Sequence, residues 1–291
     1  MGTCHLYTKY TYLQNQNQIH LMKKNVIISG GHSGIGLELT KKLLAEGHKI
    51  GLIIRNESRR KSLANSFDTS KIEFFYADLS IQSEVIRVAQ EIKDSWEKID
   101  RLFNNAGIAI MKGDRRTSEQ GNELHFEINT LAPYQLTNEL KPLLLKSDNA
   151  KVVTTVTQGL NNLKLDTERI FNKDFNSGMK LYSQSKLAVM LLMNDLAKKD
   201  DWEPVKFLNV HPGNNKTNVT QNKDTMPAFI KLMVRLFFKT PDFGGQRLYN
   251  AGFEEKLEGA NGVYLFNDKI RDVTYSLTSD DKRKLLSGIA L

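Results

Sequence analysis

Cysteine is almost absent from the 291-residue sequence, which contains only Cys4. A single cysteine forms no disulfide within the chain and cannot build a cysteine-based metal site. We expect no metal among the site residues. Scarce cysteine is also typical of proteins in a reducing compartment. We therefore expect a cytoplasmic or other intracellular location.

Long apolar runs and a signal peptide are also missing. No stretch approaches the ~20 apolar residues that a transmembrane helix needs, and residues 1–24 lack the charged-then-apolar order of a secretory signal. We expect a soluble protein, or one attached only peripherally to a membrane. Residues 1–24 include the polar run QNQNQ and few aliphatic side chains, so they predict a mobile N-terminal extension.

A concentrated basic surface is the third feature that the sequence lacks. The formal net charge is +8, but the basic residues are dispersed, with only small clusters such as Arg59-Arg60-Lys61. No basic stripe interleaved with aromatic residues marks a nucleic-acid interface. We expect no nucleic-acid partner, and the positive field would instead favour a small ligand that carries phosphate.

From Asn25 onward the sequence alternates short apolar runs with longer amphipathic segments. Apolar strands that alternate with helices indicate a parallel sheet covered on both faces. No linker rich in Pro, Gly or Ser divides the chain, so residues 25–291 predict a single doubly wound α/β domain of Rossmann type. The predicted strands are 25–29, 49–54, 71–77, a strand with its exit loop within 99–107, 150–157, 205–213 and 261–266, the last of the chain. A long helical stretch follows 99–107 and reaches Leu145.

The segment SGGHSGIG (29–36) lies between the first predicted strand and the first predicted helix. Its glycines, Gly30, Gly34 and Gly36, have the spacing GxxxGxG. Glycine permits positive φ and close approach of a ligand to the backbone, and the following helix N-terminus offers free N–H groups to a pyrophosphate. Ordinary turns also use glycine, but this position in an alternating chain favours a dinucleotide site.

The second predicted strand ends at Arg55, 19 residues after Gly36. Dinucleotide sites that prefer NAD carry Asp or Glu here to bind the ribose 2′-hydroxyl, whereas arginine suits a 2′-phosphate. An arginine at a strand end can also be a plain surface residue. The spacing favours NADP(H) over NAD(H) as the cofactor.

A series of short motifs resembles the short-chain dehydrogenase/reductase family over nearly everything after residue 24. Finer details, such as IIRNESRR, YSQSKLA, NVHPG and KTPDFGGQ, resemble its retinol dehydrogenase and WW-domain oxidoreductase branch. In chain order the family motifs are the glycine loop, Asp78 in ADLS, NNAG at 104–107, Asn129 in INTLAPYQLT, Tyr182-x-x-x-Lys186, and HPG at 211–213 followed by Thr217.

The resemblance implies roles for individual residues. Asp78 would contact the adenine, Asn129 would help to hold a proton-relay water, and Thr217 would bind the nicotinamide amide. The implied catalytic residues are Tyr182, Lys186, Thr157 and Asn129. The implied cofactor site comprises Gly30, Ser33, Gly34, Ile35, Gly36, Arg55, Asp78, Leu79, Asn105, Ala106, Gly107, Tyr182, Lys186, Pro212, Gly213 and Thr217.

The implied chemistry gives the pair Tyr182 and Lys186 a purpose. Reduction of a carbonyl needs a hydride at carbon, which a nicotinamide supplies, and a proton at oxygen. A tyrosine hydroxyl, with a reference pKa of about 10, is a slow acid near neutral pH, and a neighbouring ammonium lowers that pKa. Spacing i, i+4 on a helix places Lys186 beside Tyr182, although such pairs also arise by accident.

One position departs from the family pattern. The family has a serine at the end of the fifth strand to bind the substrate oxygen, whereas this sequence has Thr157 there. Threonine keeps a hydroxyl donor and acceptor, but its methyl group stiffens χ1 and narrows the site. We expect Thr157 to hold the substrate oxygen, while a plain strand threonine remains the alternative.

Residues 214–240 match the position of the family's substrate-covering lid. Within them, 226–239 (MPAFIKLMVRLFFK) combine apolar side chains with Lys231, Arg235 and Lys239 at a spacing of four. The pattern fits a lid over a lipophilic substrate, a helix lying on a membrane surface, or an ordinary packed helix.

Three functions are consistent with these features. The first is an NADP(H)-dependent alcohol dehydrogenase or carbonyl reductase for a lipophilic aldehyde, ketone or alcohol, which the set Asn129, Tyr182 and Lys186 supports. The second is an NADP(H)-binding sensor or scaffold with little turnover, which Thr157 supports. A membrane-surface adaptor that uses 226–239 is the third. The sequence leaves the substrate, the reaction direction and the formation of homo-oligomers open.

Overall fold

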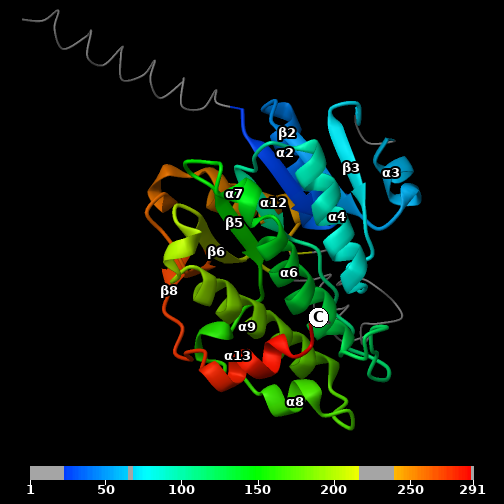
Figure 1. The fold of residues 1–291 in the computed structure, drawn as a ribbon, viewed down its shortest axis with the longest axis vertical. Helices are drawn as coiled ribbons and strands as arrows, with labels where there is room; N and C mark the ends of the chain where they lie inside the picture. The colour runs from blue at the N-terminus through cyan, green and yellow to red at the C-terminus, as the bar shows by residue number, and fades with distance from the viewer. Residues whose placement is uncertain (1–22, 65–67, 216–238, 290–291) are drawn as a thin grey trace, which may run out of the picture.

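A single sheet organises the protein, for which the computed structural model describes residues 23–64, 68–215 and 239–289 (Figure 1). The strand order is β3-β2-β1-β4-β5-β6-β7-β8. Neighbouring strands are parallel except β7 and β8, which are antiparallel. The strands are β1 (Asn25–Ser29), β2 (Lys49–Ile54), β3 (Ile72–Tyr76), β4 (Arg101–Asn104), β5 (Lys151–Thr155), β6 (Lys206–His211), β7 (Val263–Phe266) and β8 (Lys269–Arg271).

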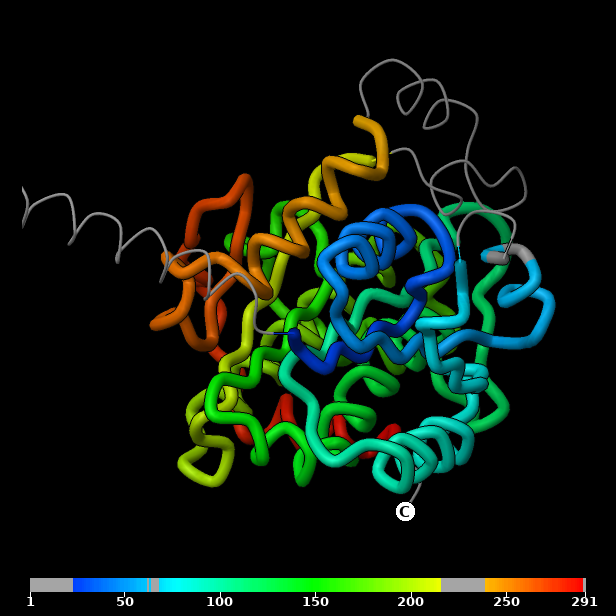
Figure 2. The backbone as a smooth tube through the Cα atoms, turned by 90° about the horizontal axis from the view of Figure 1, so that it is seen from above, coloured from blue at the N-terminus to red at the C-terminus, as the bar shows by residue number. Residues whose placement is uncertain are grey.

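Helices cover both faces of the sheet, as the alternating sequence predicted. Seen from above, α2 and α12 lie on one side of the sheet, and α4 and α13 lie on the other (Figure 2). The α-helices are α2 (Gly34–Ala45), α3 (Glu57–Ala64), α4 (Gln82–Ser95), α5 (Leu124–Phe126), α6 (Ala132–Glu139), α7 (Lys141–Leu144), α8 (Thr167–Phe171), α9 (Gly178–Leu196), α12 (Pro241–Phe253) and α13 (Ser279–Leu286), and a π turn (Glu127–Leu131) joins α5 to α6.

The two faces of β1 show why the strand sequences are continuously apolar. Ile27 packs with the helices α4, α6 and α9, whereas Val26 and Ile28 pack with α2 and α12. Because successive strand side chains point to opposite faces, a sheet covered on both sides needs apolar residues at every position. The strand order reverses between β1 and β4, and crevices for ligands form at such a point, beyond the carboxyl ends of the strands.

Two predictions about the elements are wrong. The long helical stretch expected between the exit loop at 107 and Leu145 begins only at Leu124, after a segment in which Gly113 and Gly121 adopt the positive φ of turns. It is then interrupted at Leu140, where φ and ψ of −87° and 0° end α6, and Pro142 lies in the first turn of the next helix, α7, where proline is tolerated. The strand expected at 261–266 is not the last one, because β8 follows it and forms the sheet edge.

Several predictions concern residues outside the described ranges. These are the mobile extension, of which only residues 23 and 24 are described, the position of Thr217, and most of the lid with its helix at 226–239. Asn215 and Lys239, on either side of that segment, form a parallel β-bridge. None of the described helices has the length and apolar content that crossing a bilayer requires.

Candidate active site

The glycine loop crosses the carboxyl end of β1 and leads directly into α2. Gly30 has a φ of +71°, and a Cβ atom there would lie 2.9 Å from the Cα of Ala106. A Cβ atom on Gly36 would lie 2.4 Å from the carbonyl oxygen of Gly30. The Thr40 hydroxyl donates to the carbonyl oxygens of Gly31 and Gly36, at 3.0 and 2.9 Å. Glycine at 30 and 36 is therefore required by the closeness of the backbone to itself and to the NNAG segment.

Positive charge gathers at the end of the pocket next to β2. Arg55 and Arg59 both line the pocket, as does His32 of the glycine loop. Burial, together with the charges of Arg59 and Arg55, lowers the pKa of His32 to about 4, so this histidine is neutral at pH 7. Arg59 was missed as a site residue by the sequence analysis, which placed it in a small basic cluster on the surface.

The resemblance placed both Asp78 and Leu79 at the cofactor site, but the structure positions them differently. Leu79 lines the pocket, whereas Asp78 does not. The Asp78 carboxylate accepts from the backbone N–H and the hydroxyl of Ser80, at 3.0 and 2.7 Å, and forms an ion pair with Arg55 at 3.2 Å. Asp78 therefore holds Arg55 at the pocket edge, and its predicted contact with adenine stays a prediction.

The NNAG segment connects the glycine loop with α9. Asn105 donates from its side-chain amide to the carbonyl oxygens of Ser29 and Gly30, both at 3.3 Å. A Cβ atom on Gly107 would lie 2.9 Å from Asn129 Oδ1 and 3.2 Å from Lys186 Nζ. Glycine at 107 thus lets the backbone pass close to the ammonium group of Lys186.

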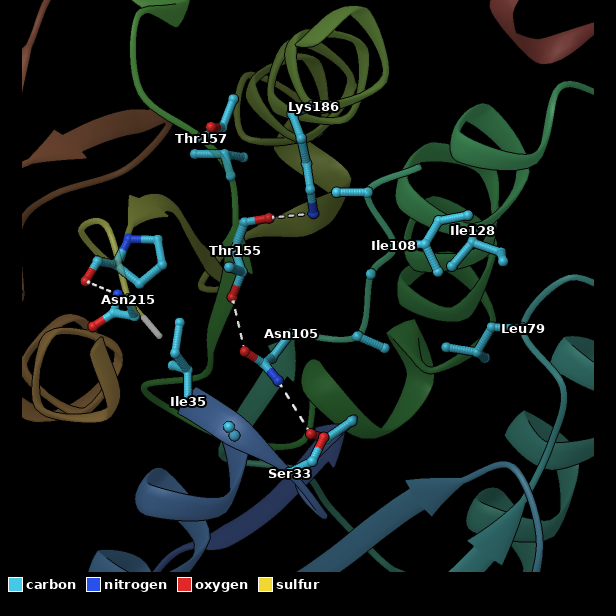
Figure 3. Close-up of a pocket in the computed structure, with 18 of the residues that line it drawn as sticks. Ser33, Ile35, Leu79, Asn105, Ile108, Ile128, Thr155, Thr157, Lys186 and Asn215 are labelled. Carbon is cyan, nitrogen blue, oxygen red and sulfur yellow. Dashed lines mark hydrogen bonds between the residues drawn. The ribbon is translucent and has the colours of Figure 1, made fainter. Parts of the chain in front are cut away.

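Tyr182 and Lys186 project from α9 toward the exit of β5. The Lys186 ammonium donates to the carbonyl oxygen of Thr155 at 2.8 Å (Figure 3). Burial lowers the pKa of Lys186 to about 8. Burial also raises the pKa of Tyr182, while a hydrogen bond with the side chain of Thr157 lowers it. The lowering of the Tyr182 pKa by Lys186 stays a prediction: in this structure Lys186 donates to Thr155, and the hydrogen bond that favours the phenolate comes from Thr157.

Asn129 lies behind the pocket wall, in the π turn between α5 and α6. It is 1% exposed and does not line the pocket. Its side chain accepts from the N–H of Ile108 at 2.9 Å and donates to the carbonyl oxygen of Ile108 at 3.0 Å and to the hydroxyl of Ser185 at 3.1 Å. Asn129 therefore joins the wall segment 107–111 to α9, and its predicted part in a proton relay stays a prediction.

His125 is a second residue that sequence reasoning missed. Its Nε2 accepts from the N–H of Ile110 at 2.8 Å, and its Nδ1 lies 2.7 Å from the Glu123 carboxylate. An Nε2 that accepts leaves the proton on Nδ1, so Glu123 fixes the tautomer. The ring of His125 also meets the Tyr182 ring edge-on, at 6.1 Å between centroids. Only its spacing of four from Asn129 could have drawn attention to it.

One pocket of about 640 Å³ unites most of the predicted residues, with Ser33 and Ile35 at one end and Thr157 and Lys186 at the other (Figure 3). The described residues contain no group of three or more His, Cys, Asp or Glu that could hold a metal ion. The predicted residues that line the pocket are Gly30, Ser33, Gly34, Ile35, Gly36, Arg55, Leu79, Asn105, Ala106, Gly107, Thr157, Tyr182, Lys186, Pro212 and Gly213.

Comparison with known proteins identifies the class to which this arrangement belongs. The family model described as short chain dehydrogenase matches residues 24–228. The chain belongs to this family of oxidoreductases, as the order of its motifs predicted.

Relatives within the family agree with the finer resemblance. The chain is 30% identical to polyprenol dehydrogenase of Homo sapiens over 254 residues, which cover 84% of this chain and 76% of that protein. It is 28% identical to human retinol dehydrogenase 14, over 83% of this chain and 77% of that one. Within the family it is therefore similar to the retinol dehydrogenase branch.

Solved structures show the same fold at lower identity. An NADPH-bound carbonyl reductase from chicken fatty liver has a TM-score of 0.64 at 17% identity, covering 86% of this chain and 99% of that one. BdcA in complex with NADPH has a TM-score of 0.64 at 18% identity, covering 84% and 93%. These similarities establish the Rossmann-like fold of the chain.

Proposed function

We propose that the protein is an NADP(H)-dependent oxidoreductase that interconverts a lipophilic aldehyde or ketone and the corresponding alcohol. The observation that carries the proposal is the hydrogen bond between Tyr182 and Thr157 in the wall of the same pocket that the glycine loop closes at its other end. A proton donor and an oxygen-binding hydroxyl thus face the space beside a dinucleotide site, as carbonyl reduction requires.

The walls of the pocket fit NADP(H). A Cβ atom would fill the loop at Gly30 and Gly36, so the backbone there is bare for a pyrophosphate at the start of α2. Arg55 and Arg59 offer cations to a 2′-phosphate. Within the described part of the chain, the buried Nδ1 of His32 has no hydrogen-bond partner, so it can serve the same ligand. Solved structures of similar fold that contain NADPH or NADP support this choice.

When bound, the cofactor supplies or accepts the hydride. Tyr182 then gives its hydroxyl proton to the carbonyl oxygen, or takes it back from the alcohol in the reverse direction. The Thr157 hydroxyl has one proton to donate: given to the substrate oxygen it holds the reacting group, and given to Tyr182 it favours the phenolate left there. Lys186 reaches the pocket beside Gly107 and adds positive charge next to this phenolate.

The wall next to Tyr182 supports a lipophilic substrate. Ile108, Ala109, Met111, Val156 and Met179 all line this pocket, and Met179 is 50% exposed at its rim. Such a surface gains free energy by covering apolar groups, at roughly 25 cal/mol per Å² of buried area. The names of the relatives, polyprenol dehydrogenase and retinol dehydrogenase, are consistent with a long apolar alcohol.

The test is cofactor oxidation by the full chain with a panel of lipophilic aldehydes and ketones, with NADPH and then with NADH. We expect turnover with NADPH, and a fall of about 10³-fold in kcat for Tyr182→Phe, the upper range for loss of a general acid. NADPH affinity, measured by fluorescence titration, should change little in this variant.

A second function is favoured by one observation, the threonine that replaces the family's serine beside Tyr182. It is a sensor or scaffold that binds NADP(H) without turning over. Tight binding of NADPH with no turnover across the panel, and an NADPH affinity that Tyr182→Phe does not change, would favour the sensor over the enzyme. In that case Thr157→Ser is the variant in which we would expect turnover to appear.

A further inference from the structure

Tyr264 is a buried residue of β7 whose hydroxyl reaches the exit of β5. The residue is 1% exposed. Its hydroxyl donates to the carbonyl oxygen of Thr157 at 2.9 Å and accepts from the backbone N–H of Leu160. β7 pairs with β6, and β6 pairs with β5, so the tyrosine side chain reaches past one whole strand.

The two groups that Tyr264 contacts are the first and fourth positions of a turn. Between Thr157 and Leu160 lie Gln158 and Gly159, and Gly159 has φ and ψ of 77° and 6°. These angles belong to the third position of a type II turn, which favours glycine. The hydroxyl of Tyr264 therefore bridges the carbonyl and the N–H that define the ends of this turn.

The position of Thr157 depends on this contact because the strand no longer holds it. β5 ends at Thr155, and the following backbone bond to β6 runs from the N–H of Val156 to the carbonyl oxygen of Val210 at 2.9 Å. Beyond it, the backbone of Thr157 is held at its carbonyl oxygen by the hydroxyl of Tyr264. The branched side chain of threonine has few χ1 states, so fixing its carbonyl group also fixes where its hydroxyl points.

We propose that Tyr264 is a positioning residue for catalysis, which holds the backbone of Thr157 so that the Thr157 hydroxyl meets Tyr182. The inference rests on the proposed function, because it gives Tyr264 its effect through the proton donor. Burial raises the pKa of Tyr264 to about 12, so the group stays a neutral donor over the working pH range. It acts on the reaction through Thr157 without touching the reacting atoms.

The variant Tyr264→Phe tests the proposal, since it removes one hydroxyl and keeps the ring. We expect kcat to fall about tenfold, the effect of one lost neutral hydrogen bond, with the Kd for NADPH unchanged. Tyr275→Phe is the matched control: it removes a tyrosine hydroxyl that donates to Asp281 at 2.8 Å in the C-terminal segment. Its kcat should equal that of the wild type.

The pH profile separates positioning from a loss of fold stability. Thr157 lowers the pKa of Tyr182, so a displaced Thr157 lets that pKa rise. Reduction needs the protonated phenol. The decline of the reduction rate at alkaline pH should therefore begin at a higher pH in Tyr264→Phe than in the wild type. If Tyr264 served only the stability of the fold, the variant would contain less active enzyme, but the pH at which its rate declines would not change.

A double-mutant cycle gives the decisive result. If Tyr264 acts through Thr157, adding Tyr264→Phe to Thr157→Val should leave kcat where Thr157→Val alone puts it. Additive losses, or wild-type kcat in Tyr264→Phe, would overturn the proposal. If the wild type turns over no carbonyl, the proposed function fails, but ultraviolet titration of the Tyr182 phenolate, assigned with Tyr182→Phe, still decides: an unchanged pKa in Tyr264→Phe refutes the inference.

Discussion

The two ends of the pocket are built from different materials. At the nucleotide end, the pocket is formed by the backbone of residues 30–36 and by long cationic side chains that are exposed to water. The side chain of Arg55 is 54% exposed. At the chemical end, Lys186 is 4% exposed, and the carbonyl oxygens of Thr155 and Thr157 accept from buried side chains of α9 and β7. Backbone shape forms the first end, and a network of buried side chains forms the second.

This difference teaches where each end is sensitive to mutation. Exposed cations act through screened electrostatics, so a single loss changes ligand affinity modestly. Buried, mutually bonded groups are strengthened by their low-dielectric surroundings and lose much when one partner is removed. We therefore expect substitutions at the nucleotide end to change binding, and those at the chemical end to change rate.

Lys186 lies where the two ends meet, and its replacement should have the largest effect. We expect Lys186→Met to lower kcat by about 10³-fold. Lys151, at the other end of β5, is 1% exposed, and burial also lowers its pKa to about 8. Lys151→Met should leave kcat unchanged. The fall of kcat in Lys186→Met would then come from removing a group of the site, and not from removing a buried charge in general.

Stability measurements on these two variants have a defined pH dependence. The pKa of Lys186 falls from 10.5 in the unfolded chain to about 8 in the fold. Between these values the unfolded state binds more protons, so wild-type stability rises with pH across this window, and the cost of the buried charge is constant below it. Either Met variant should show a smaller rise, and at pH 7 a free energy of unfolding higher by about 1–3 kcal/mol. If stability rose with pH in both variants as much as in the wild type, these lysines would not be buried charges with lowered pKa values.

The variant Gly36→Ala should have the next largest effect and should act on binding. Its Cβ would lie 2.4 Å from the carbonyl oxygen of Gly30, so the loop must shift. Overpacking costs about 2 kcal/mol, which corresponds to about 30-fold in the Kd for NADPH. Gly259→Ala is the matched control, because its Cβ would meet open space. Equal affinities in the two variants would show that the loop does not bind the cofactor.

The same contrast explains what the sequence could predict. The parallel sheet and the glycine loop were predictable because each depends on a local pattern: apolar runs of strand length, and glycines at fixed spacing. Tyr264 was not, because its partner Thr157 lies 107 residues away and the bond depends on the packing of three strands. His125 was missed for a similar reason, since its contact with Ile110 forms only when the loop folds back over α5. Long-range contacts leave no periodicity in a sequence.

His125 offers a test of the chemical end at a residue outside the predicted set. His125→Phe removes the acceptor for the N–H of Ile110 and the donor to Glu123. The wall beside Tyr182 should then loosen, lowering kcat by about tenfold with the Kd for NADPH unchanged. His125→Gln can supply both an acceptor and a donor, and we expect it to restore most of the rate. If both variants match the wild type, the wall needs no fixing by this residue.

Arg59 should show the smallest effect, because it is exposed and acts through water. We expect Arg59→Ser to raise the Kd for NADPH about fivefold, equivalent to about 1 kcal/mol, and to leave the Kd for NADH unchanged, since NADH has no 2′-phosphate. Titrations at low and high salt should show the variant losing part of the salt dependence.

Arg60→Ser is the control for Arg59→Ser, because Arg60 is the adjacent cation and does not line the pocket. It pairs with Glu57 at 3.5 Å and lies 5.2 Å from the ring centroid of Phe74. If Arg60→Ser weakened NADPH binding as much as Arg59→Ser, the general positive field of α3 would explain the preference, and no specific contact would be needed. A loss confined to Arg59→Ser and to NADPH would instead assign the phosphate contact to one side chain, so that even the water-exposed end of the pocket would rest on geometry.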